Sequence, residues 1–289
     1  MPEFTQAQKA LLLLLVVLFA VGGFFLLNQT EPTTENNTPE EPVISEPAPP
    51  ATSTQSQIGT SVEGRAIESF TFGTGSTSLL FVGGVHGGYE ANSVRLAEAM
   101  IDEFQKKPEL VPANVTVHII PVLNPDGYAR HLDSATDYTD GQKRFNANGV
   151  DLNRNFGCKW APQSTWRGQT VSAGTAAFSE PEAQALRQYV RDTSPKAAVF
   201  WHSVANNVYA SECENGILPQ TLTLMNAYAD AGNYGKVEKF DAYPITGDVE
   251  GWLASIGIPA ITVELETRDS IEWTRNFAGT QAVLQMYTQ

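Results

Sequence analysis

Four short apolar runs, separated by stretches with helical spacing, constrain the fold of this chain most strongly. The runs are Leu79–Val85, Val115–Leu123, Ala197–Trp201 and Pro259–Val263. Because they are nearly continuously apolar, they are typical of strands buried on both faces. Helical patterns occur at Ala91–Phe104, Ala183–Val190, Thr221–Ala231, Val249–Ile256 and Ile271–Tyr287. This alternation predicts an α/β fold with a largely buried sheet.

Two local signals refine this pattern. In "SEPE", Ser179 and Glu182 have the spacing of a capping box, which predicts a helix start just before Ala183. In "NPDG", Asn124–Gly127 combines Pro, Asp and Gly directly after an apolar run, which predicts a tight turn or loop.

The N-terminal region differs in composition from the rest. After a short tail, residues 1–9, comes an unbroken apolar run, Ala10–Leu27. As a helix this run would be about 27 Å long, enough to cross a bilayer core. We predict an uncleaved transmembrane anchor, with a cleaved signal peptide as the alternative. Lys9 precedes the run and no basic residue follows until Arg65, so we expect the remainder of the chain on the extracytoplasmic side.

Residues 28–57 are rich in Pro, Glu, Thr and Ser and are predicted to form a disordered linker. Residues 58–289 then form one domain, long enough to bury a substantial core. The first 57 residues carry one Lys and six Glu, which leaves the domain with a net charge of −9. Such a surface argues against a nucleic-acid partner.

Three side chains capable of metal or proton chemistry follow apolar strands. His86 and His202 come directly after two of the runs, and Glu264 follows the last. Ligands of open α/β sheets bind beyond the carboxyl ends of strands, so we expect these residues in one crevice. A buried, unpaired carboxylate is costly, so Glu264 requires a partner or a catalytic role.

The segment "GGVHGGYE" adds a second carboxylate, Glu90, to His86. Two histidines and a carboxylate form the ligand set of a catalytic zinc site. The glycines permit a sharp turn, so that His86 and Glu90 can face His202. Each residue also has an ordinary interpretation, because a single His after a strand is more often a core residue and Glu90 suits a helix N-terminus. The joint order of the three favours the metal site.

The segment Arg144–Phe156 contains two arginines in a Gly- and Asn-rich context, suited to binding anions. Together with "NPDG", "GVDLNRNF", "HS" after a strand and "TVEL", in this order, it resembles the zinc carboxypeptidase family of carboxypeptidases A and B. The resemblance covers nearly all of residues 58–289. It implies a single domain with a mostly buried mixed β-sheet flanked by helices.

The resemblance also implies the roles of individual residues. His86, Glu90 and His202 would bind one Zn²⁺, and Asp151 would orient His86 through a hydrogen bond. Glu264 would be the general base that activates a water at the zinc, and Arg144 would polarise the scissile carbonyl. Substrate-binding residues would be Asn153 and Arg154, which hold the terminal carboxylate, and Tyr243, which covers the pocket.

One departure from the family pattern concerns the first motif. Family members have two residues between His and Glu, whereas three separate His86 from Glu90, and Tyr89 takes the usual ligand position. An extra residue in a Gly-rich turn can be absorbed, and Tyr is a poor zinc ligand at neutral pH. We therefore keep Glu90 in the predicted ligand set.

The implied function is zinc-dependent hydrolysis of the C-terminal residue from a peptide. Three alternatives stay open: a peptidoglycan stem-peptide peptidase, an N-acyl amino acid deacylase on the same scaffold, and a binding module with an inactive site. The expected partners are therefore a peptide or cell-wall peptide and, through the N-terminal helix, a membrane. We expect a monomer.

Two further predictions concern specificity and redox state. By position relative to Tyr243 and Trp252, the resemblance places Glu250 at the floor of the side-chain pocket, with Asp248 as an alternative. An acid there would favour C-terminal Lys or Arg, or the amino group of a diamino acid. Cys158 and Cys213 flank the expected crevice, and we predict that they form a disulfide outside the membrane.

Overall fold

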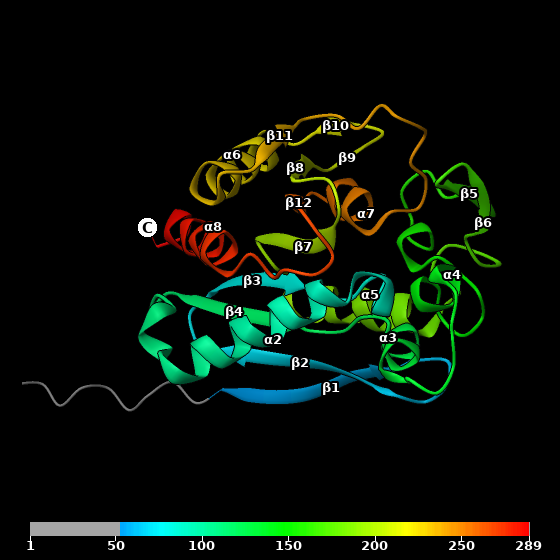
Figure 1. Cartoon of the computed structure of the whole chain (residues 1–289). Coiled ribbons are helices and arrows are strands. Elements are labelled where there is room, and N and C mark those ends of the chain that lie inside the picture. Colours follow the sequence, from blue (N-terminus) through cyan, green and yellow to red (C-terminus); the bar gives the residue numbers. More distant parts are fainter. Residues whose placement is uncertain (1–52, 289) are drawn as a thin grey trace, which may run out of the picture. The chain divides into compact units, whose positions relative to one another are not determined.

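The computed structural model describes residues 53–288, in which a mixed sheet of eight strands forms the centre (Figure 1). Its order is β1-β2-β4-β3-β7-β12-β8-β11. The strands are β1 (Thr54–Thr60), β2 (Ala66–Phe72), β3 (Thr77–Val82), β4 (Val115–Ile120), β7 (Ala197–Ser203), β8 (Asn207–Ala210), β11 (Gly235–Val237) and β12 (Ala260–Leu265). The central strands β4, β3, β7 and β12 are parallel, whereas β1, β2 and β8 introduce antiparallel pairs. The predicted α/β fold with a mixed sheet is confirmed.

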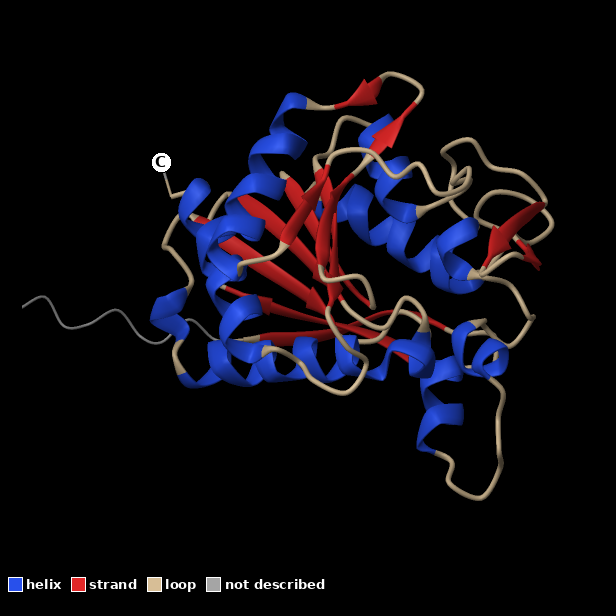
Figure 2. Ribbon diagram, turned by 45° about the horizontal axis from the view of Figure 1, so that its top comes forward, coloured by secondary structure: helices blue, strands red, loops and turns tan. Residues whose placement is uncertain are grey.

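Helices cover both faces of the sheet (Figure 2). The α-helices are α2 (Ala91–Lys106), α3 (Pro125–Leu132), α4 (Asp140–Arg144), α5 (Pro181–Thr193), α6 (Pro219–Gly232), α7 (Val249–Ser255) and α8 (Trp273–Met286). Three short 3-10 turns are η1 (Gly87–Glu90), η2 (Pro108–Leu110) and η3 (Leu152–Arg154). Two small hairpins, β5 (Gln163–Trp166) with β6 (Gln169–Ser172) and β9 (Glu212–Cys213) with β10 (Gly216–Ile217), lie outside the main sheet.

The central strands are buried on both faces because alternate side chains enter two separate cores. In β3, Leu79 and Phe81 pack in the core shared with α2, α6 and α8. Leu80 and Val82 of the same strand point to the core shared with α5 and α7. This two-sided burial explains why the strands read as continuous apolar runs rather than as alternating patterns.

Two local predictions are wrong. Ser179 does not cap α5: its hydroxyl donates to Glu180, and Glu182 turns away to accept a hydrogen bond from the Val62 backbone. "NPDG" is not a turn between elements but the start of α3, where the Asn124 side chain accepts from Gly127 N and Pro125 occupies the first turn. Asn is a good N-cap and Pro suits the first turn, so both signals also fit a helix start.

The predicted linker extends too far. β1 begins at Thr54 and pairs with β2 from Thr54 to Thr60, so residues 54–57 belong to the sheet. Within residues 53–288, no helix is both long enough and apolar enough to cross a bilayer. The predicted anchor, residues 10–27, and most of the linker lie outside the described residues.

Candidate active site

The carboxyl ends of three parallel strands, β3, β7 and β12, meet at one edge of the sheet. β7 and β12 are paired in register, which sets Glu264 directly opposite His202. β3 pairs with the other side of β7 and leads, four residues after Val82, into His86. Parallel pairing therefore brings together residues that lie far apart in the sequence, as the strand-end argument predicts.

The loop between β3 and α2 is folded tightly against its surroundings. Gly84 and Gly87 have φ of +60° and +48°, values that side chains with a Cβ rarely adopt. A Cβ on Gly87 would also lie 2.9 Å from the backbone of Gly127 and from Lys143 O. The 3-10 turn η1 takes up the residues between His86 and Glu90, so the additional residue in this motif is absorbed without displacing the carboxylate.

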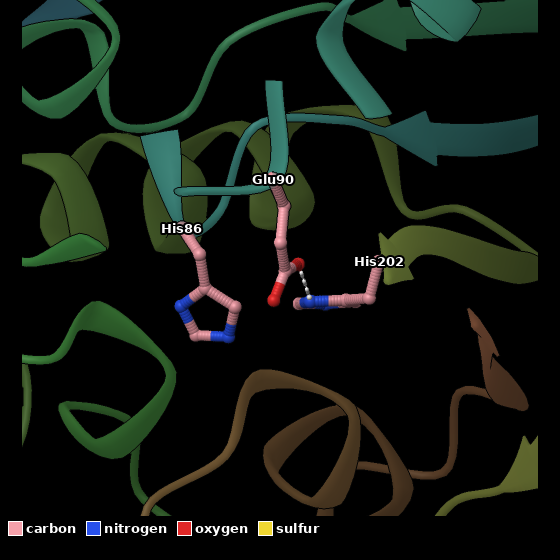
Figure 3. Close-up of side chains that lie close together, drawn as sticks. All are labelled: His86, Glu90 and His202. Atoms are coloured by element: carbon pink, nitrogen blue, oxygen red, sulfur yellow. Dashed lines mark hydrogen bonds and ion pairs between the residues drawn. The ribbon is translucent and has the colours of Figure 1, made fainter. Parts of the chain in front are cut away.

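The side chains of His86, Glu90 and His202, here called the metal cluster, converge from this loop and from β7 (Figure 3). One potential ligand atom from each lies within 4.8 Å of the others, and all three residues are buried. His202 Nδ1 lies 3.0 Å from Glu90 Oε2, and His86 Nδ1 has no hydrogen-bond partner among the described residues. Two imidazoles and a carboxylate at this spacing fit one zinc ion.

The two histidines of the cluster have opposite protonation tendencies. Burial, reinforced by the positive charge of Arg144, holds the pKa of His86 well below its usual value, which favours the neutral imidazole that a metal requires. Burial also opposes the charged form of His202, but the carboxylates of Glu90 and Glu250 outweigh it and raise its pKa to about 10. A metal cation on the same donors would replace that proton.

Glu264 is a half-buried residue beside the metal cluster. Its Oε2 atom has no hydrogen-bond partner in the described part of the chain. Burial, together with the negative charge of Glu90, raises its pKa to about 7, while His202 and Arg144 oppose this rise. A carboxyl group with a pKa near neutrality is suited to accept and return a proton.

Arg144 links the metal cluster to Asp151. Its Nε donates to Asp151 Oδ2 at 3.0 Å, and its Nη1 lies 3.6 Å from Glu90 Oε1. The guanidinium also lies over the Trp166 ring, 4.8 Å from its centroid. Asp151 Oδ1 is 3.6 Å from His86 Nδ1, beyond hydrogen-bond range, so a direct bond between them stays a prediction.

Asn153 and Arg154 line the same cavity of about 960 Å³. Arg154 is buried, donates to the carbonyls of Asn153 and Thr165, and has an Nε without a hydrogen-bond partner in the described residues. Asn153 Oδ1 accepts from Val249 N, which leaves its amide hydrogens as donors. The pair therefore offers hydrogen-bond donors, and no carboxylate within residues 53–288 forms an ion pair with Arg154.

The model of one protein family, zinc carboxypeptidase (peptidase M14), matches residues 46–278. The chain belongs to this family. It is a metallopeptidase, and within residues 53–288 its zinc site consists of His86, Glu90 and His202. The predicted ligand set is confirmed, including Glu90 despite the extra residue.

Two curated relatives illustrate the range of this zinc carboxypeptidase family. Murein peptide amidase A of Escherichia coli K12 is 27% identical over 217 residues, covering 72% of this chain and 78% of the relative. The catalytic chain of carboxypeptidase N from rat is 26% identical over 230 residues, which cover 68% of this chain and 48% of the relative. The chain spans about half or less of the length of the curated carboxypeptidases it matches.

Among solved structures, murein-tripeptide amidase MpaA of E. coli O157 superimposes with a TM-score of 0.63 at 24% identity, covering 83% of this chain and 93% of the other. At this identity the likeness shows that the fold is shared.

The zinc carboxypeptidase cavity also holds the residues predicted to select the substrate. Tyr243 is half-buried and packs its ring against Phe240 at 4.8 Å. Glu250 is buried, accepts from Thr262 Oγ1 at 2.9 Å and lies 3.4 Å from His202 Nε2. Asp248 caps α7 by accepting from Gly251 N. Glu250 thus contacts a metal ligand as well as the cavity, a placement that the sequence did not indicate.

Cys158 and Cys213 form a disulfide that connects the segment after η3 to the β9–β10 hairpin. Cys158 lines the cavity, so the bridge ties two walls of the active site together.

Two cavity residues, Trp166 and Arg268, were not predicted. Trp166 comes from the β5–β6 hairpin, where no motif distinguishes it. Arg268 follows Glu264 by four residues in "ETRDS". Its closeness in sequence to Glu264 at the end of β12 is a signal that could have identified it.

Proposed function

We propose that this domain is a metallocarboxypeptidase that removes the C-terminal residue from peptides. The observation that carries this proposal is Arg154, a buried guanidinium that shares a cavity with the zinc site and, in the described region, has no acidic partner. An unpaired guanidinium is suited to binding a carboxylate. In a peptide whose last peptide bond lies at the zinc, the carboxylate next to that bond is the one at the C-terminus. Asn153 adds further donors to the same group.

The remaining residues account for hydrolysis. When bound, zinc supplies Lewis acidity for the carbonyl and for a water molecule. Glu264 removes a proton from the attacking water and returns it to the leaving amine. Arg144 donates hydrogen bonds to the oxyanion that develops at the carbonyl, and Asp151 holds Arg144 in place.

For the side chain of the departing residue, we propose a preference for a cationic group. Glu250 and Asp248 both line the cavity, and the carboxylate of Glu250 is buried there. This supports selection of C-terminal Lys or Arg, or of the second amino group of a diamino acid.

A cell-wall peptide is the second candidate substrate. A murein peptide amidase is covered over 78% of its length in the sequence comparison, and a murein-tripeptide amidase over 93% of its length in the structural one, which supports this candidate. A stem peptide that ends in a diamino acid would satisfy both Arg154 and the acidic side of the cavity.

We also propose that the domain lies outside the cytoplasmic membrane, tethered by residues 10–27. The basic-residue asymmetry around this run supports the orientation. The disulfide between Cys158 and Cys213 supports an oxidising compartment.

The function can be tested with matched peptides that end in Lys, carrying either a free or an amidated C-terminus. We expect release of Lys only from the free acid, loss of activity with a chelator, and a strong decrease in kcat/KM for Arg154→Gln. Purified muropeptides and N-acetyl-lysine, followed by mass spectrometry, separate a cell-wall peptidase and a deacylase from a general carboxypeptidase. Equal cleavage of the amidated peptide would contradict the exopeptidase assignment.

A further inference from the structure

A second arginine without an acidic partner lines the active-site cavity. Arg268 lies in the loop after β12, and its Nη2 donates to the Tyr89 hydroxyl at 2.9 Å and contacts Ser203 O at 3.5 Å. Its Nε is buried and has no hydrogen-bond partner among residues 53–288. In the same part of the chain, no carboxylate forms an ion pair with it, although the domain is acidic overall.

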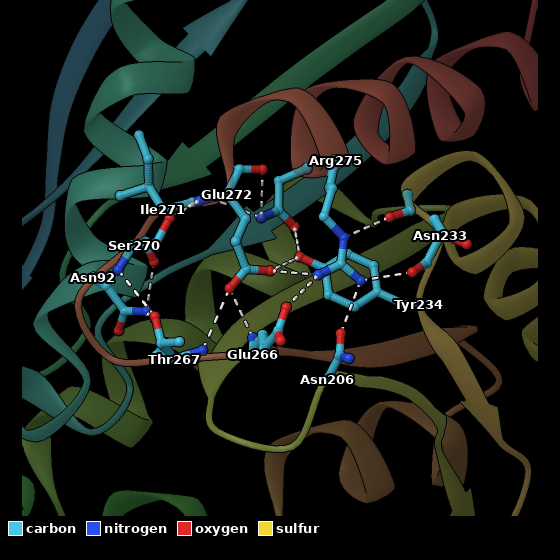
Figure 4. A network of polar contacts seen from close by, with 12 residues as sticks. Asn92, Asn206, Asn233, Tyr234, Glu266, Thr267, Ser270, Ile271, Glu272 and Arg275 are labelled. Atoms are coloured by element: carbon cyan, nitrogen blue, oxygen red, sulfur yellow. Dashed lines mark hydrogen bonds and ion pairs between the residues drawn. The ribbon is translucent and has the colours of Figure 1, made fainter.

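Arg268 is not needed to hold its own loop. The loop is fixed by Asn92, whose amide donates to Thr267 O at 2.7 Å and to Ser270 O at 3.0 Å (Figure 4). At the other end, Glu272 accepts from the Glu266 backbone at 2.7 Å. Because these bonds already anchor both ends of the loop, the position of the Arg268 charge inside the cavity calls for a separate explanation.

Different elements hold the two unpaired arginines. Arg154 rests on the carbonyls of Asn153 and Thr165, in η3 and β5. Arg268 rests on Tyr89 and Ser203, each next in sequence to a metal ligand, and its guanidinium lies 4.3 Å from the centroid of the Tyr89 ring. The metal cluster is therefore flanked by two cationic groups on separate walls of the cavity.

We infer that Arg268 binds a carboxylate on the acyl side of the scissile bond, that is, on the residue that contributes the scissile carbonyl. This inference rests on the proposed exopeptidase function, in which Arg154 already takes the terminal carboxylate. A substrate with one anionic group on each side of the zinc site would engage both arginines. An α-linked glutamate meets this requirement, and so does a γ-linked glutamate, whose α-carboxylate remains free beside the scissile bond.

The test uses two matched pairs of substrates with the full chain. One pair is N-acyl-Glu-Lys and N-acyl-Gln-Lys, and the other is N-acyl-γ-D-glutamyl-Lys and its α-amide. Removing one charge-assisted hydrogen-bonding group is expected to lower kcat/KM for the acidic members by about 10- to 100-fold in Arg268→Gln. The neutral members should change by less than about threefold, so the acid-to-neutral ratio falls toward one. Arg268→Lys should restore part of this ratio.

Arg167→Gln is the matched control, because Arg167 lines the same cavity but lies 3.6 Å from Asp140 in an ion pair. It should leave the acid-to-neutral ratio unchanged. Zinc content and thermal unfolding of each variant show whether it is folded. The inference is overturned if the wild type does not prefer the acidic members, or if Arg268→Gln slows both members equally.

The two proposals can fail separately. If the neutral members are cleaved but the ratio does not depend on Arg268, the acyl-side site is wrong and the carboxypeptidase remains. If no member of either pair is cleaved by a zinc-loaded wild type, the proposed function is wrong and the inference fails with it.

Discussion

Two groups of buried acidic and polar residues lie on either side of the segment that carries Arg144 and Arg154. The groups differ in how completely their polar atoms are hydrogen-bonded. The first, here called the acid cluster, consists of Asp126, Glu180 and Glu182, all buried. Asp126 accepts from the Ser61 hydroxyl, the Glu63 backbone and Arg65. Both of its oxygens are therefore occupied by groups of the β1–β2 turn.

The two glutamates of the acid cluster are equally well bonded. Glu180 accepts from the side chains of Asn146 and Asn148, each at 2.7 Å. Glu182 accepts from Asn146 and from the Val62 backbone. The cluster thus fastens the N-terminal strands to the loop that bears the active-site arginines, and it leaves no capacity for a ligand.

The active site contains the opposite arrangement. Glu264 Oε2, His86 Nδ1, Arg154 Nε and Arg268 Nε are buried without hydrogen-bond partners among the described residues. A buried polar group costs free energy unless it is hydrogen-bonded, so these atoms are stable only in a site built to receive something else. Buried atoms without a hydrogen-bond partner also occur elsewhere, for example Ser78 Oγ and Thr280 Oγ1, but these are neutral hydroxyls. The comparison teaches that burial of a charged side chain does not by itself mark function here, whereas the charged and histidine side chains with unsatisfied buried atoms all line the cavity.

Among the tests of this comparison, removal of a metal ligand should have the largest effect. Glu90→Ala should lose the zinc, because two imidazoles alone hold it weakly, and peptide hydrolysis should fall to background. Zinc content by atomic emission and kcat/KM on a Lys-ended peptide measure both effects. Asp241→Ala, at an exposed acid that lines the same cavity, is the control and should retain both. Full zinc occupancy in Glu90→Ala would remove Glu90 from the ligand set.

Replacing the proposed general base, Glu264, should affect activity and stability differently. Glu264→Gln keeps the shape but removes the base, so turnover should fall by at least about 100-fold while zinc is retained. Because the substitution removes an unsatisfied buried carboxylate, stability should be unchanged or higher. Steady-state kinetics measure the turnover, and urea unfolding measures the stability. Near-normal turnover would refute the role of Glu264.

In the acid cluster, a substitution should instead lower stability and leave the zinc site intact. Asp126→Ala leaves buried donors of Ser61 and the Glu63 backbone without an acceptor and should lower the free energy of unfolding by roughly 3 kcal/mol. Zinc content should remain at one ion per folded chain. Urea unfolding measures the loss, and Glu109→Ala at an exposed site supplies the baseline. A variant as stable as the wild type would mean that the cluster does not stabilise the fold.

The smallest expected effect concerns His118, a buried group outside both clusters. Burial lowers its pKa to about 4 from 6.5. Between these values the unfolded chain binds one proton more than the folded chain, so stability decreases as the pH falls below 6.5. At pH 5 this contribution amounts to about 1 to 2 kcal/mol relative to pH 7.

Replacement of His118 tests whether this side chain takes up the additional proton on unfolding. His118→Asn should lose less stability than the wild type between pH 7 and pH 5, as followed by urea unfolding. Tyr189→Phe removes a hydrogen bond to the same ring without removing the titrating group, so its pH dependence should match the wild type. If all three curves run parallel, His118 does not titrate in this range.

The parts of the site that could be predicted from the sequence are those fixed by strand order. His86, His202 and Glu264 follow apolar runs, and the parallel sheet alone brings such residues to one edge. The ligand Glu90 was indicated by its place in the Gly-rich turn after His86, although a helix-start interpretation stayed open and the family pattern, with one residue fewer, put Tyr89 at the ligand position.

The parts that could not be predicted depend on contacts between distant segments. Ser179 and Glu182 have the spacing of a capping box, yet Glu182 is used by Val62 and Asn146, more than thirty residues away in sequence. Tertiary hydrogen bonds of this kind outweigh a local capping preference. The place of Arg268 in the cavity likewise depends on Tyr89, which lies 179 residues earlier.

The order of the active-site residues along the chain has a consequence for biosynthesis. Glu90 and His202 are 112 residues apart, and the chain emerges from the ribosome N-terminus first. All three metal ligands and both Arg144 and Arg154 are therefore synthesised before β12, which carries Glu264 next to His202. The nascent protein therefore gains its zinc ligands before it gains Glu264, the proposed base. On this proposal, peptide hydrolysis is the last capability to be assembled as the domain is made.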